Sequence, residues 1–170
     1  MKKNPLFYFA LLQIIFGYEW LTTGWGKIVG DQFVSSLPKT LEFFASKNPY
    51  DWYKNFLLGF ATNNATLFGY LVQWGEFLAG LGLVAGALVI IFYKKELWTK
   101  IFLEISAAAG IGGAMMNAFY YFAAAWTSPS AHGVNMIMFW AQLIIVAALY
   151  EIGLRKKIQT TTPEESQNYV

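Results

Sequence analysis

Four long apolar blocks alternate with shorter polar stretches along the chain. They cover about residues 6–26, 66–92, 97–125 and 134–154. Each block is long enough to cross a bilayer as a helix, which needs about 20 apolar residues. The pattern therefore predicts an all-α fold, a polytopic membrane four-helix bundle.

The segment between the first two blocks, residues 28–65, follows a different pattern. Charges of both signs are mixed with apolar residues that recur every three or four positions. This predicts an extracytoplasmic insertion of one or two amphipathic helices that lie on the membrane surface or cap the bundle. We expect Pro38 and the Asn48–Pro49 pair to interrupt these helices.

The composition agrees with a membrane protein. Of 170 residues, 56% are hydrophobic and 13% are charged, whereas soluble domains have about 25% charged residues. Cysteine is absent, which excludes disulfides and thiolate metal sites. With a single histidine we expect no metal site and no covalently bound cofactor. The basic residues flank the apolar blocks, so we expect no nucleic-acid partner.

The basic residues also predict the orientation. Eight lie at the N-terminus, in the 93–100 loop and after the fourth block, whereas four are spread over the opposite side. The positive-inside rule then gives a multi-pass protein of the cell membrane with both termini cytoplasmic. The first block is too long for a signal peptide and lacks a small-x-small cleavage site. We expect one integral membrane domain over residues 1–158 and a disordered cytoplasmic tail over 159–170.

One carboxylate lies well inside the second apolar block. Glu76 is the only formally charged residue between Thr66 and Tyr93. A charge near the centre of a membrane helix costs about 2.5–3.5 kcal/mol, so we expect it to have a partner or a function. Gln73 precedes Glu76 by three positions and shares its helix face. That face is predicted to look towards a polar interior.

Polar residues of the other blocks are expected at a similar depth, because successive spans run in opposite directions. Together they predict one polar layer in the outer half of the bundle, made of Glu19, Glu76, Asn117 and Asn135, with Lys27, Gln73 and His132 at or just above it. His132 is placed in a loop at 127–133, and the inner half is predicted to be nearly all apolar. Two carboxylates in one layer of low dielectric should not both ionise unless Lys27 or a ligand compensates. The alternative role of Lys27 is an interfacial anchor.

The polar layer has two interpretations. It is either a hydrogen-bonded plug that fixes the register of the helices, or a site open to the outer leaflet for an amphipathic molecule such as a quinone. Quinone chemistry needs protonatable groups and an aromatic wall that holds a flat ring. In the second interpretation Glu76 and Glu19 are the candidate catalytic residues. The candidate ligand-binding residues are Lys27, Gln73, Trp74, Asn117, His132 and Asn135.

Gly82 and Gly86 form a Gly-x-x-x-Gly pair in the second block. Such pairs let two backbones approach closely. We expect the pair to pack against another helix of the same chain, with a homo-oligomer as the alternative. A transporter or channel is disfavoured, because an apolar inner half would lack groups to line a path.

Several features occur together along residues 6–154. Gly17 and Gly24-Trp-Gly-Lys27 end the first block, and a long amphipathic segment follows. Gly75-Glu76 is then followed by Gly80-Leu-Gly-Leu-Val-Ala-Gly86, and the fourth block opens with Asn135. The combination resembles the DoxX/DoxD family of small four-helix membrane proteins.

The resemblance implies a membrane oxidoreductase or a subunit of one. In the thiosulfate:quinone oxidoreductase of this family, a DoxD-type integral subunit works with a DoxA-type partner, and thiosulfate is oxidised to tetrathionate as quinone is reduced. The implied partners are membrane lipid, quinone and a second oxidoreductase subunit. The alternative is a non-enzymatic accessory or assembly factor, or a protein that binds lipid or quinone.

Overall fold

The computed structural model describes residues 5–92 and 96–161, and these residues form helices with no β-strand among them. In chain order the elements are α1 (Pro5–Val29), α2 (Phe33–Lys47), α3 (Asp51–Phe56), the π-helical segment η1 (Leu57–Ala61), α4 (Ala65–Phe92), α5 (Glu96–Ala124) and α6 (Pro129–Thr161). The predicted all-α class is therefore confirmed for the described part of the chain.

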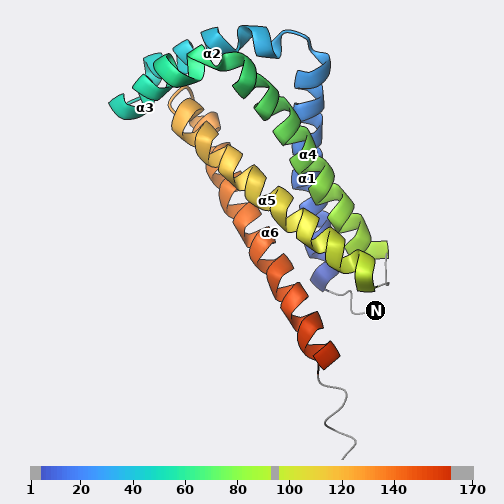
Figure 1. Ribbon diagram of the computed structural model, residues 1–170. Helices are drawn as coiled ribbons and strands as arrows, with labels where there is room; N and C mark the ends of the chain where they lie inside the picture. Colours follow the sequence, from blue (N-terminus) through green and yellow to red (C-terminus); the bar gives the residue numbers. More distant parts are fainter. Residues whose placement is uncertain (1–4, 93–95, 162–170) are drawn as a thin grey trace, which may run out of the picture.

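The long helices α1, α4, α5 and α6 run along one another, and α2 and α3 lie across one end of them (Figure 1). Helix α1 packs mainly on α4, α4 also packs on α5, and α5 packs on α6. Helices α1 and α6 meet at only a few positions. The insertion between α1 and α4 thus covers the end of the molecule where α1 finishes and α4 begins.

Three helical stretches are long and apolar enough to cross a membrane, namely Ala65–Phe92, Thr99–Ala124 and Pro129–Glu151. Helix α1, whose apolar run includes Gln13 and Glu19, is not among these stretches. The structure therefore supports a membrane protein with three candidate spans among the described residues.

The outward faces of the long helices are apolar. Large exposed side chains on them include those of Leu12, Ile15, Leu71, Leu78, Leu81, Ile111, Met115, Phe119, Ile137 and Ile144. Soluble monomers rarely expose so continuous an apolar surface. Contact with membrane lipid accounts for it.

The insertion consists of two helices, as its pattern predicted, followed by a π-helical turn that was not predicted. Helix α2 buries Leu37, Leu41 and Ala45 on one face. These side chains form a small hydrophobic core with Tyr53 of α3 and Ala123 of α5. The insertion is thereby packed against the end of α5 rather than held away from the long helices.

Of the two predicted interruptions, one is confirmed and one is wrong. Helix α2 ends at Lys47, directly before the Asn48–Pro49 pair, and the next helix begins at Asp51. Pro38, in contrast, lies inside α2. Proline removes one hydrogen bond from a helix interior, but the buried apolar face of α2 continues past Pro38 and keeps the helix intact.

The predicted loop at 127–133 is also wrong, because α6 begins at Pro129 and includes His132. The hydroxyl of Ser128 accepts a hydrogen bond from the backbone N–H of Ala131, and proline suits the first helical position.

At its other end α6 continues to Thr161, past the predicted domain boundary at residue 158. The rest of the tail, Lys94 and Lys95, and the N-terminal lysines lie outside the described residues.

Candidate functional site

Glycines let α1 and α4 approach each other closely. A Cβ atom on Gly24 would collide with the backbone nitrogen of Phe77, and one on Gly80 would collide with the backbone nitrogen of Leu21. Backbone atoms cannot rotate away as side chains can, so these two positions accept only glycine at this separation. The close approach places the end of α1 against the middle of α4.

This approach brings a lysine and a carboxylate together. Lys27 Nζ lies 2.5 Å from Glu76 Oε2. The hydroxyl of Tyr120, on α5, donates a hydrogen bond of 2.6 Å to Glu76 Oε1. We call Lys27, Glu76 and Tyr120 the carboxylate cluster. It joins three helices, and both oxygens of the carboxylate have a donor from the same chain.

The surroundings of the carboxylate cluster differ at its two ends. The side chain of Glu76 is 3% exposed, whereas that of Lys27 is 26% exposed. The Lys27 ammonium lies 5.4 Å from the centre of the Phe33 ring, at the start of α2. The ring of Tyr120 lies 6.3 Å from that of Trp20, which is buried. The cluster thus runs from a buried aromatic pair to a partly exposed cation.

Lys27 supplies the compensating charge that the sequence pattern demanded for Glu76, so it is more than an interfacial anchor. Tyr120 was not identified from the sequence as a partner of the carboxylate. A signal was present, because Tyr120 follows the inward-facing Asn117 by three positions and so shares its helix face.

A second polar contact joins α5 to α6. Asn117 Nδ2 donates a hydrogen bond of 3.0 Å to Gln142 Oε1, and both side chains are buried. Gly113 leaves room for the Gln142 amide, which a Cβ atom there would overlap. Gln142 Nε2 has no hydrogen-bond partner among the described residues. Gln73 is buried on the same face of α4 as Glu76.

A third polar contact lies deeper along the helices, where the sequence predicted an apolar region. Gln13 Nε2 donates to the hydroxyl of Ser106 and, at 2.9 Å, to the carbonyl of Leu83. Ser106 precedes Tyr120 by 14 residues on α5, which corresponds to about 21 Å along a helix. The buried polar groups therefore occupy several levels, and the prediction of one polar layer above an apolar half is wrong.

Gly86 makes the third contact possible, because a Cβ atom there would overlap the Ser106 side chain. Gly82 similarly lies against Ala109. The predicted Gly-x-x-x-Gly pair thus packs α4 against α5 within one chain, as expected.

Two predicted site residues lie away from the carboxylate cluster. Glu19 is exposed on α1, and Trp74 is 47% exposed on α4. At 100° per residue, Trp74 points about 160° away from Glu76 around the helix, and Glu19 about 80° away from Lys27. The depth of Glu19 and Trp74 along their helices is compatible with the predicted polar layer, but their side chains point away from the carboxylate cluster.

His132 and Asn135 also lie outside the carboxylate cluster. His132 is exposed, and its Nε2 lies 3.1 Å from the hydroxyl of Tyr121. Asn135 is partly buried and donates a hydrogen bond of 2.7 Å to the carbonyl of Ala131 in its own helix. Of the predicted set, the structure brings Lys27 to Glu76 and gives Asn117 a separate partner.

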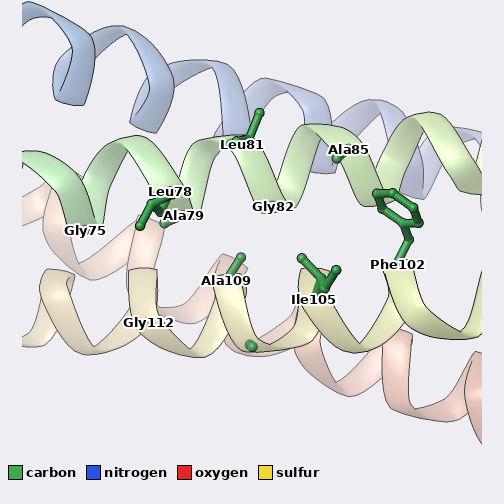
Figure 2. A pocket seen from close by; sticks show the side chains of 11 residues that line it. Gly75, Leu78, Ala79, Leu81, Gly82, Ala85, Phe102, Ile105, Ala109 and Gly112 are labelled. Atoms are coloured by element: carbon green, nitrogen blue, oxygen red, sulfur yellow. The ribbon is translucent and has the colours of Figure 1, made fainter.

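Two grooves open between the long helices. One, between α4 and α5, has a volume of about 630 Å³ and is lined by small and aliphatic residues and by Phe102. Figure 2 shows Ala79 and Gly82 facing Ile105 and Ala109 across it. The other, between α1 and α6, has a volume of about 530 Å³ and includes Glu19. Neither groove is lined by a member of the carboxylate cluster.

The fold and the site together define a helical protein with three candidate membrane spans and a charged cluster between α1, α4 and α5. No protein-family model, curated protein or solved structure matches the chain. The resemblance to the DoxX/DoxD family accordingly stays a prediction from the sequence.

Proposed function

We propose that this chain is a DoxX/DoxD-type protein of the cell membrane that serves as a quinone-linked oxidoreductase subunit. In this proposal α1 crosses the bilayer beside the three candidate spans, which completes a four-helix bundle with both termini in the cytoplasm. The supporting observation is the carboxylate cluster, a lysine–glutamate pair with a tyrosine partner between long, mostly apolar helices. Ionisable residues at such positions are expensive and commonly functional.

The cluster has the groups that proton-coupled chemistry needs. Reduction of a quinone to a quinol consumes two electrons and two protons. Glu76 is placed to exchange a proton with Tyr120 on its buried side and with Lys27 on its exposed side, since both lie at hydrogen-bond distance. The partial exposure of Lys27 connects the buried carboxylate to water.

Thiosulfate is the electron donor in this proposal. Two thiosulfate ions would lose one electron each and join through a new sulfur–sulfur bond to give tetrathionate. The two electrons would pass to the quinone, which takes its two protons through the carboxylate cluster. A second subunit would carry the thiosulfate site. A dianion needs concentrated positive charge, whereas Lys27 is paired with Glu76 and the other candidates, Lys39, Lys47, Lys54 and His132, are few and spread out.

The test compares Glu76→Gln with Glu104→Gln, which removes the same charge from an exposed position on α5. The protein, purified with its native partners in mild detergent, is assayed for thiosulfate-dependent quinol formation by absorbance. Small molecules that co-purify are identified by mass spectrometry. We expect stoichiometric quinone in the wild type, loss of turnover in Glu76→Gln and retention in Glu104→Gln. A folded Glu76→Gln variant that turns over at the wild-type rate would falsify the proposal.

A second candidate function is favoured by one observation. Both oxygens of Glu76 are already satisfied within the chain, and neither groove reaches them. This is the arrangement expected of a plug that fixes helix register in a non-enzymatic accessory or lipid-binding protein. That function predicts tightly bound phospholipid or a partner protein, and no turnover with any donor.

A further inference from the structure

The groove between α1 and α6 contains a carboxylate that the carboxylate cluster does not use. Glu19 is exposed there, in a space of about 530 Å³. The other residues that line it are Ile14, Ile15, Phe16, Tyr18, Val134 and Met138. Apart from the tyrosine hydroxyl, the wall around this carboxylate is apolar.

Glu19 lies level with the middle of α4. On one side of it, Gly17 of α1 packs against Gly80, and on the other side Gly24 packs against Phe77. Helix α4 is a candidate membrane span that extends from Ala65 to Phe92, so these contacts are near its centre. When the long helices cross the bilayer, Glu19 is therefore at hydrocarbon depth, where a carboxylate is costly unless it has a partner.

The described part of the chain offers Glu19 no such partner. Lys27 is paired with Glu76, and Lys54 is paired with Asp51. Helix α6, which forms the other wall, has no lysine or arginine from Pro129 to Glu151. Glu76 is thus neutralised from within the chain, and Glu19 is not.

We infer that this groove is a binding site for a lipophilic cation, a molecule with an apolar body and one positive charge that enters from the lipid. The Glu19 carboxylate would supply the opposite charge, and the Phe16 and Tyr18 rings would add cation–π attraction. The aliphatic wall suits an apolar body, and Met138 adapts to irregular shapes. The groove volume lies within the usual range of small-molecule sites, about 300–1,000 Å³.

This site is distinct from the proposed quinone chemistry and depends on the membrane setting alone. The two ideas fail separately, because binding of a cation requires no turnover. Glu19→Gln should leave quinol formation intact, and Glu76→Gln should leave cation binding intact.

The probe is tetraphenylphosphonium, measured by equilibrium dialysis against the full chain in mild detergent. Tetraphenylborate has nearly the same shape and the opposite charge, so it reports partition into the micelle. We expect saturable binding of the cation to the wild type and none of the anion. Glu19→Gln should bind the cation about tenfold more weakly or worse, because it loses the charge that the cation pairs with. Glu42→Gln, an exposed charge change on α2, should stay within about twofold of the wild type.

A second variant keeps the charge and fills the space. Val134 is 55% exposed at the groove, so Val134→Trp should fold normally while its indole occupies the site. We expect this variant also to lose cation binding. Absence of saturable binding in the wild type, or wild-type affinity in either Glu19→Gln or Val134→Trp, overturns the inference.

Discussion

Replacing Glu76 with glutamine removes the charge of the carboxylate cluster and keeps its shape. The amide oxygen can still accept the hydrogen bond from Tyr120, but the Lys27 ammonium, which is 26% exposed, loses its counter-ion. Hydrogen bonds to charged groups contribute about 1.5–3 kcal/mol. Since Lys27 can regain part of its hydration, we expect the free energy of unfolding to fall by about 2 kcal/mol.

The change on the other side of the ion pair, Lys27→Met, should lower the free energy of unfolding by more than Glu76→Gln does. It leaves the Glu76 carboxylate, 3% exposed, without its cation, and breaking a buried pair from one side costs about 3–5 kcal/mol. The double variant has no unpaired charge, so its loss should be close to that of Glu76→Gln alone. We therefore expect a coupling free energy of about 3–5 kcal/mol between the two positions.

The assay is unfolding in mixed micelles with increasing dodecyl sulfate, followed by far-ultraviolet circular dichroism and linear extrapolation. The matched control is the surface pair of Lys54 and Asp51, 3.4 Å apart with the aspartate 92% exposed. Its coupling should be below about 0.5 kcal/mol. If the effects at Lys27 and Glu76 add to within about 0.5 kcal/mol, the ion pair does not hold these helices together and the reasoning fails.

Three further predictions follow from the packing and the insertion. Gly24→Ala should lower the free energy of unfolding by about 1–3 kcal/mol through overpacking. Gly26→Ala, whose Cβ would meet open space, should instead raise the free energy of unfolding by about 0.5–1 kcal/mol. Equal effects of the two variants in the same unfolding assay would contradict the close approach of α1 and α4. Asn117→Ala should cost about 1 kcal/mol, because Gln142 loses its buried partner, and Asn117→Ala with the wild-type unfolding midpoint would show that this contact adds nothing. Burial raises the pKa of Tyr53 from 10.0 to about 12, so its contribution to stability should be complete below pH 10 and be lost as the pH rises towards 12; the difference in phenolate absorbance from Tyr53→Phe measures this, and ionisation complete near pH 10 would refute it.

The long helices were predictable because each contains a long, mostly apolar run. The centres of these helices could be predicted without knowing how the helices pack, whereas their ends could not. The start of α6 at Ser128–Pro129 was predicted as a loop because it lacks apolar residues. A serine cap and a first-turn proline are nevertheless helix-start signals. Pro38 shows the opposite error, a local breaker that tertiary packing of α2 overrides.

The candidate site was predictable in composition but not in pairing. Lys27 stood out as a charge at the end of the first apolar block and Glu76 as a charge inside the second. Their contact, however, depends on the rotation of α1 and on its approach to α4 at Gly24. Depth alone also assigned Glu19 to the same site, because a count of residues along a helix does not say which way a side chain points. The Gln13–Ser106 contact was missed for the same reason.

The hydrogen bonds between the insertion and α5 have a consequence for biosynthesis. Asn48 Nδ2 donates to the carbonyl of Phe122, 74 residues later in the chain, and the hydroxyl of Tyr53 donates to the carbonyl of Phe119. At roughly 5–20 residues per second, the ribosome needs about 4–15 s to reach the acceptor after making its donor. During that interval α2 and α3 lack the contacts that α5 provides, so this end of the molecule is complete only after α5 has been made.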